Sequence, residues 1–152
     1  MNLDSSYARP DVTAALSRLL SDSALWRAAL GACPVPVAVL DAGSPERALS
    51  YANPAFEAFF GYRRTETQGR SLAALLFQGD EPLMHRLLAA PNSYWHVRAR
   101  ARDGSTRHVE LAIGAVRNNE GRVTYWVLSF SDRSEAESLR AELESLRPAA
   151  AA

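Results

Sequence analysis

A short capped helix with an aromatic face, at residues 53–62, constrains the fold of this chain more than any other segment. Asn53 is a favourable N-cap because its side-chain oxygen can accept a hydrogen bond from a free amide of the first turn, and Pro54 suits the first helical position. Gly61 can adopt the left-handed conformation that ends a helix. So short a helix is not stable alone in water, and its phenylalanines must therefore pack against a sheet supplied by the rest of the chain.

Alternation of apolar and polar residues predicts that sheet. Two short strands precede the helix, at residues 35–41 and 47–52, and three longer strands follow between residues 95 and 130. Asp103-Gly104 is typical of a hairpin turn between two of them. Short helical segments are expected near residues 65–66, 71–76 and 80–90. The predicted fold class is α+β, a five-stranded antiparallel sheet with short helices on one face and flanking N- and C-terminal amphipathic helices.

Several motifs follow one another in a fixed order through this region. They are Asn53-Pro54-Ala55-Phe56, Phe60-Gly61-Tyr62, Glu66, Gly69-Arg70 and Ser131-Asp132-Arg133-Ser134-Glu135. Together they resemble the core of PAS sensor domains, many of which close with Asp-x-Thr/Ser-Glu. The resemblance divides the chain into an N-terminal leader with an amphipathic helix (1–31), a PAS core (32–133) and a C-terminal signalling helix with its tail (134–152).

The resemblance implies a sensory or signal-transduction module of the kind used in bacterial two-component systems. Its partner would then be an effector protein such as a kinase or a transcription regulator. No Ser-His-Asp order, phosphate-binding glycine loop or inward pair of carboxylates appears in the sequence. We therefore predict that the chain is not an enzyme.

Composition bounds the partners and the compartment. Seventeen basic residues, all arginine, balance seventeen acidic ones, so no net field draws the chain to nucleic acid or to an anionic membrane. The sequence shows no secretory signal and no run of about 18 apolar residues. Cys33 is the only cysteine, which excludes an internal disulfide and fits a reducing compartment. We expect a cytoplasmic protein that binds neither nucleic acid nor membranes.

An apolar chamber between the helices and the sheet is the predicted ligand site. Its expected lining is Phe60, Leu72, Leu76, Leu87, Val97, Ala99, Val109, Leu111, Leu128 and Phe130. Small residues such as Ala99 leave space for an apolar or aromatic ligand, whereas Trp95 and Trp126 could fill that space. A ligand pocket and a self-filled core both fit this pattern.

Flavin is disfavoured as the occupant of that chamber. PAS domains of the light-oxygen-voltage (LOV) type hold flavin with polar side chains, and the resemblance places apolar residues at the matching positions. Leu72 replaces their adduct-forming cysteine, Ala73 an arginine and Leu76 a glutamine, while Ala99, Val109 and Phe130 replace two asparagines and a glutamine. Unpaired polar atoms on the flavin ring would cost about 1–3 kcal/mol each.

Haem is the alternative cofactor, and the cofactor otherwise remains unknown. PAS oxygen sensors place a proximal histidine on the long helix that follows the Gly-Arg pair, and His85 lies on that helix. An ordinary helix position is the commoner explanation of a single histidine without a companion motif. His96 and His108 fall on the wet face of the predicted strands without the spacing of metal ligands, so no metal site is predicted.

Two flanking helices carry apolar stripes that predict association. In the N-terminal helix the stripe includes Leu16, Leu19 and Leu20, and in the C-terminal helix it consists of Leu139, Leu143 and Leu146. We predict a homodimer through these helices, with a coiled coil formed by the C-terminal pair. Two alternatives stay open. The N-terminal helix can pack on its own domain, and the chain can be a ligand-free structural dimerisation module.

An arginine stripe lies along one predicted hairpin. It consists of Arg98, Arg100, Arg102 and Arg107. Such a stripe can meet an acidic partner or a phosphate, but a solvated strand face is the commoner explanation, since no aromatic residue is interleaved for base stacking.

Overall fold

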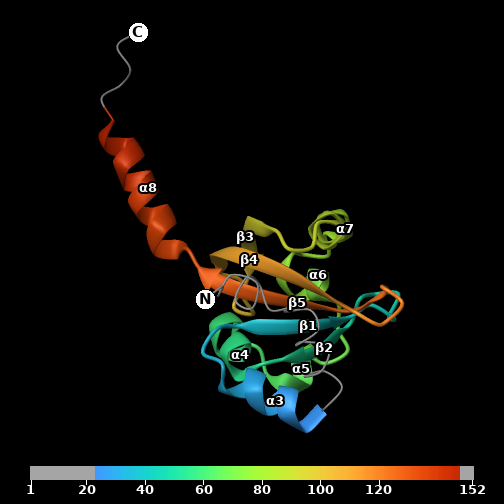
Figure 1. Ribbon diagram of the computed structural model, residues 1–152. Coiled ribbons are helices and arrows are strands. Elements are labelled where there is room, and N and C mark those ends of the chain that lie inside the picture. Colours follow the sequence, from blue (N-terminus) through green and yellow to red (C-terminus); the bar gives the residue numbers. More distant parts are fainter. Residues whose placement is uncertain (1–22, 148–152) are drawn as a thin grey trace, which may run out of the picture.

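The computed structural model describes residues 23–147 (Figure 1). Its helices are α3 (Ser23–Ala32), α4 (Pro54–Phe60), α5 (Arg64–Thr67), α6 (Leu72–Leu76), α7 (Glu81–Ala89) and α8 (Ser134–Leu146). Its strands are β1 (Val37–Asp41), β2 (Leu49–Ala52), β3 (Tyr94–Arg100), β4 (Thr106–Arg117) and β5 (Val123–Asp132). The predicted association residues Leu16, Leu19 and Leu20 lie outside the described residues.

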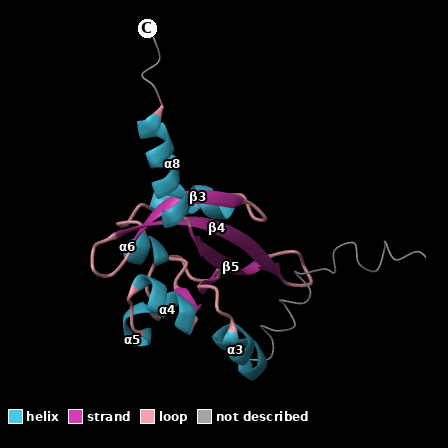
Figure 2. Ribbon diagram, turned by 90° about the vertical axis from the view of Figure 1, so that its left-hand side faces the viewer, coloured by secondary structure: helices cyan, strands magenta, loops and turns pink. Residues whose placement is uncertain are grey.

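The strands form one antiparallel sheet in the order β2-β1-β5-β4-β3. The last strand of the chain therefore lies between β1 and β4, and β2 and β3 form the two edges. Helices α4, α6 and α7 bury their apolar side chains against one face of this sheet. The turned view shows α4 and α6 beside the sheet (Figure 2). The predicted fold class, an α+β fold with a five-stranded antiparallel sheet and helices on one face, is confirmed.

Local capping explains where the short helices begin and end. Asn53 caps α4, because its Oδ1 atom accepts a hydrogen bond of 3.0 Å from the amide of Phe56. Asp80 caps α7 in the same way by accepting 3.0 Å from the amide of Leu83. Gly61 ends α4 with a left-handed backbone, at φ 79°. These are the caps that the sequence predicts.

Strand β2 is shorter than predicted at its start. Arg47 has a left-handed backbone with φ 51°, which cannot continue an extended strand. Ala48 instead forms an isolated bridge with Ser71, and regular pairing begins at Leu49. The strand therefore covers Leu49–Ala52 rather than residues 47–52.

Asn53 joins three elements at the base of the sheet. Its buried Oδ1 atom accepts a second hydrogen bond, of 2.8 Å, from the amide of Val37 in β1. Its Nδ2 atom donates to the carbonyl of Leu30 at 3.0 Å and to that of Val35 at 2.8 Å. Helix α3 also packs on its own domain through Trp26, whose ring meets that of Tyr51 edge to face at 4.8 Å.

Candidate functional site

The predicted chamber residues all meet in one apolar cluster. Except for Val97, which is partly buried, each of them is almost completely shielded from solvent. The rings of Phe60 and Phe130 pack edge to face with centroids 5.2 Å apart, and Phe56 packs against both. Trp95 and Trp126 lie against the same cluster. The side chains expected to line the chamber are therefore in contact with one another as part of the core.

The residues at the flavin-contacting positions are apolar and buried, and His85 lies outside the core cluster. Leu72, Ala99 and Phe130, which stand at three of the flavin-contacting positions, are buried in apolar contact with the other core side chains. His85 is exposed on α7, and its Nδ1 atom lies 3.1 Å from Nη2 of Arg47. The imidazole therefore lies outside the core cluster, where it is not placed to serve as a proximal ligand of a haem in the chamber.

A surface cavity of about 400 Å³ opens beside the core between α6, α7 and β3. Leu76 and Ala99, two of the predicted chamber residues, form part of its lining together with Phe77 and Leu83. The polar part of its lining is Gln78, Asp80, Arg98, Arg100 and Thr106, with Gly104 between them. We call this hollow the β3 groove. It is the hollow of the surface that lies next to two residues of the predicted chamber.

The four arginines of the predicted stripe have different surroundings. Arg102 forms an ion pair with Glu66 at 2.6 Å, and this hydrogen bond lowers the pKa of the Glu66 carboxyl below its ordinary value. The guanidinium of Arg107 lies 5.9 Å from the ring centroid of Phe59. Arg98 and Arg100 form no hydrogen bond or ion pair with any residue of the described segment. Two free guanidinium groups therefore border the β3 groove.

Helix α8 leaves the domain at the end of β5 and projects away from it (Figure 1). The carboxylate of Asp132 accepts a hydrogen bond of 2.8 Å from the amide of Ser134, and hydrogen bonding to Ser134 lowers the pKa of Asp132. Beyond this turn, none of the residues of α8 is buried within the described part of the chain. Leu139, Leu143 and Leu146 are 53%, 68% and 74% exposed.

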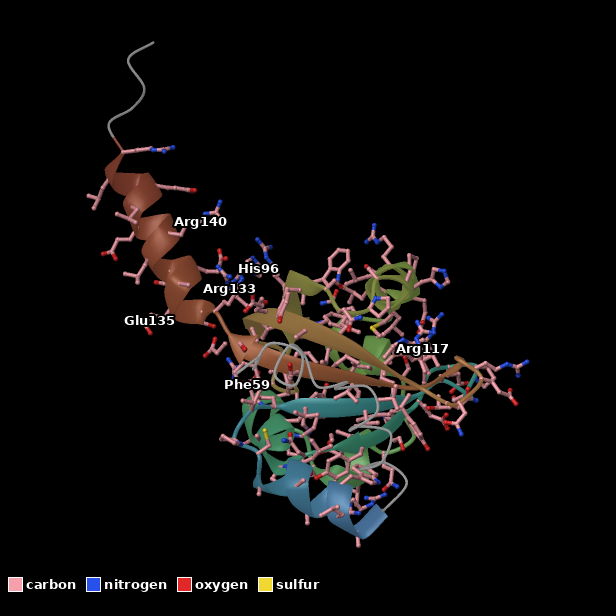
Figure 3. The ribbon with its side chains drawn as sticks, in the orientation of Figure 1. Phe59, His96, Arg117, Arg133, Glu135 and Arg140 are labelled. Carbon is pink, nitrogen blue, oxygen red and sulfur yellow. The ribbon has the colours of Figure 1, made fainter. Side chains whose placement is uncertain are left out.

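A charged cluster surrounds the root of α8, beside a hollow of about 140 Å³. Nε2 of His96 lies 2.6 Å from Nη1 of Arg133 and 3.3 Å from Oε1 of Glu110. Figure 3 shows His96 and Arg133 side by side where β3 and the start of α8 meet. Arg133 and Glu137 form an ion pair at 3.9 Å, and Arg140 and Glu144 form another at 3.7 Å.

Sequence reasoning assigned no role to His96, although it placed this residue on the wet face. The contact with Arg133 joins residues that lie 37 positions apart. It depends on the registers that align β3 with β4 and β4 with β5. Alternation alone indicates a face of the sheet but not which residues are opposite one another.

The family model described as PAS fold matches residues 24–133. This match covers most of the chain, and the protein therefore belongs to the PAS family, whose domains are generally sensory. A search of the curated proteins gave no match. Among the helices of residues 23–147, none has the length and apolar character needed to cross a membrane.

Solved structures with the same fold include LOV and PAS domains. An RNA-binding Light-Oxygen-Voltage receptor is similar at 29% identity and a TM-score of 0.70, over 85% of this chain and 37% of that one. This chain thus spans little more than a third of that receptor. The PAS domain of an HTR-like protein from Haloarcula marismortui is 24% identical, with a TM-score of 0.57, over 76% of this chain and 94% of that one. The LOV domain of a blue-light activated histidine kinase from Erythrobacter litoralis EL346 is 23% identical, with a TM-score of 0.56, over 66% and 96% of the two chains.

Proposed function

We propose that this chain is a PAS signalling module that forms a homodimer through the leucine face of α8 and passes its signal through that helix. The observation that carries the proposal is the exposure of Leu139, Leu143 and Leu146 on a helix that projects from the domain. A lone helix of 13 residues is marginal in water, so such a face gains stability by pairing.

A second copy of the chain is the partner that fits this face. The leucines return after four and then three residues, which is the spacing of a two-stranded coiled coil. Arg140 and Glu144 pair beside the stripe, so the charged groups lie on its flanks rather than within it. In a parallel pair the same leucines would meet across the two-fold axis.

The signal would travel from the sheet into this helix. Strand β5 runs through the middle of the sheet and ends at Asp132, directly before α8. A change in the core or in partner contacts that shifts β5 would alter the angle at which α8 leaves the domain. We further propose that an effector such as a kinase or a transcription regulator receives this change, and that the module works in the cytoplasm.

Sedimentation equilibrium tests the dimer. The expected result is an association that depends on concentration and that Leu139→Glu with Leu143→Glu abolishes, since two buried charges would face their copies. Ser138→Glu adds a charge to the same helix outside the leucine stripe and should leave the association unchanged. A single species of 16.6 kDa for the unmodified chain at high concentration would refute the proposal.

A second candidate function is the binding of a small molecule with an apolar body and an anionic group in the β3 groove. The volume of about 400 Å³ lies within the usual range of ligand sites. Leu76, Leu83 and Ala99 contribute to the apolar side of its lining, where Leu83 is the partly exposed one, and Arg98 and Arg100 line it as well and carry a complementary charge.

Decanoate and decanol are suitable probes for this groove because they differ in the charged group. We expect decanoate to raise the melting temperature and to perturb the amide signals of Leu76 and Ala99, while decanol does so more weakly. Arg98→Gln with Arg100→Gln should remove the preference for decanoate. Arg117→Gln, on the β4–β5 hairpin, is the matched control. If decanoate leaves the spectrum of the unmodified chain unchanged, the groove is not such a site.

A further inference from the structure

Nε2 of His96, close to the start of α8, lies near two side chains of opposite charge. Nε2 of His96 lies within hydrogen-bond distance of the Arg133 guanidinium, at 2.6 Å, and close to the Glu110 carboxylate, at 3.3 Å. In a neutral imidazole Nε2 either carries a hydrogen or presents a lone pair. It can therefore accept from Arg133 or donate to Glu110, but it cannot do both.

We propose that protonation of His96 controls whether the start of α8 is held against strand β3. In the neutral form, with its hydrogen on Nδ1, Nε2 accepts from Arg133 and ties the residue that precedes α8 to strand β3. When Nε2 takes up a proton from solvent, the bond to Arg133 is lost and the bond to Glu110 forms. The imidazolium and the guanidinium then repel each other, and α8 is released from β3. This inference does not rest on the homodimer or on the β3 groove.

The register of the sheet keeps the acceptor in place. His96 and Glu110 are directly paired across β3 and β4, so the carboxylate stays beside the imidazole whatever α8 does. Glu110 is therefore the fixed partner of the His96 imidazole, and Arg133 is the movable one. Histidine side chains generally change charge between about pH 5 and 8, and α8 would be released from β3 in this range.

Other charges around His96 set the balance between the two states. Glu110 on β4 and Glu137 on the first turns of α8 attract a positive charge there. Arg98 on β3 and Arg133 repel it, and His108 on β4 lines the same hollow. The main-chain carbonyl of His108 accepts from the amide of Arg133 at 2.7 Å, and a substitution of the His108 side chain leaves that bond in place.

Release of Arg133 matters because α8 has few other ties to the domain. No residue of the helix is buried within the described part of the chain, and the pair of Arg133 with Glu137 lies within the helix region itself. Nε of Arg133 is buried without a hydrogen-bond partner among residues 23–147. Its side-chain bond to His96 is thus the polar contact through which Arg133 reaches β3. The adjacent hollow of about 140 Å³ leaves room for the guanidinium to move.

The test uses NMR on the full chain between pH 8 and pH 5. It follows the His96 imidazole signal together with hydrogen-exchange protection of the α8 amides, corrected for the intrinsic rate at each pH. We expect protection in the first turns of α8 to fall about tenfold on acidification, with the midpoint at which His96 titrates, because a charge-assisted hydrogen bond is lost.

Four variants separate His96 from its neighbours. His96→Gln keeps an acceptor for Arg133 but does not titrate, so protection of α8 should no longer depend on pH. His108→Gln and His85→Gln should retain the pH dependence. Glu110→Gln should move the midpoint to lower pH, because the imidazolium loses its carboxylate partner. Protection that is constant with pH in the unmodified chain, or that changes equally in His96→Gln, would overturn the proposal.

Discussion

The side-chain amide of Asn53 donates a hydrogen bond of 2.8 Å to the carbonyl of Val35, across 18 positions of the chain. With the bonds to Val37 and Phe56, this one buried side chain connects the segment before β1, the strand itself and the first turn of α4. Asn53→Ala should lower the free energy of unfolding by about 2–4 kcal/mol, since it removes a cap and leaves buried main-chain groups unpaired. Chemical denaturation measures this loss.

Asn53→Asp is the informative companion to that substitution. A carboxylate still accepts from Val37 and Phe56, but it cannot donate, and it would face the carbonyls of Leu30 and Val35. We expect it to destabilise the fold as well. Asn119→Ala, at an exposed position of the β4–β5 turn, should be nearly neutral. A small loss for both Asn53 variants would show that the network contributes little.

The core should bind an apolar ligand only when a large side chain is removed. Phe130→Ala is expected to cost about 3–5 kcal/mol and to leave a cavity beside Phe56 and Phe60. Benzene should then raise the melting temperature of the variant but not that of the unmodified chain. Stabilisation of the unmodified chain by benzene would show instead that its chamber opens.

Gly61 is required by backbone conformation rather than by space. A Cβ atom at this position would meet Cβ of Arg102 at an ordinary 3.7 Å, but the φ of 79° is unfavourable for any residue with a side chain. Gly61→Ala should therefore lower stability by about 1–2 kcal/mol. Gly114→Ala is the matched control in thermal unfolding, since its φ is not in the left-handed region and its nearest neighbour is 3.9 Å away.

The hydrogen bond between Asp132 and Ser134 makes the stability of the start of α8 depend on pH in a second, more acidic range. Hydrogen bonds from Ser134 lower the pKa of this carboxyl in the folded state. The contribution of the cap is therefore fully present above the ordinary pKa of aspartate, about 4, and is lost as the pH falls through the lower folded value. Circular dichroism at 222 nm should show loss of helix in this acidic range.

Asp132→Asn separates charge from geometry at that cap. The amide oxygen of asparagine can still accept from the amide of Ser134, but it does not titrate. The acid-induced loss of helix should therefore shrink in this variant relative to the unmodified chain. An unchanged acid transition would assign the loss to other carboxylates, such as Glu66 and Asp103, whose pKa values are also lowered.

Local patterns were sufficient for the elements and their order. Asn53, Asp80 and Gly61 identify helix ends through chemistry that involves only neighbouring residues. Alternation from Trp95 to Phe130 identifies which side chains face the helices. The same patterns were insufficient at Arg47, whose left-handed backbone shortens β2, because nothing in its immediate neighbours requires that conformation.

The occupancy of the chamber was not determined by those patterns. The lining residues were identified from the sequence, but whether they enclose space depends on how rings from α4 and β5 interlock, as Phe60 and Phe130 do at 5.2 Å. Packing of side chains that are 70 positions apart is a property of the assembled core. The exposed direction of His85 is likewise decided by how α7 sits on the sheet.

The sequence by itself determined the PAS family, the α+β fold and the apolar stripe on the C-terminal helix, because caps, turns and periodicity act within a few residues. Tertiary structure alone decided that the rings of Phe60 and Phe130 pack together in the core, that Arg98 and Arg100 line an open groove, and that His96 meets both Arg133 and Glu110. These features arise from strand register and from the meeting of elements distant in the chain, which no local pattern encodes.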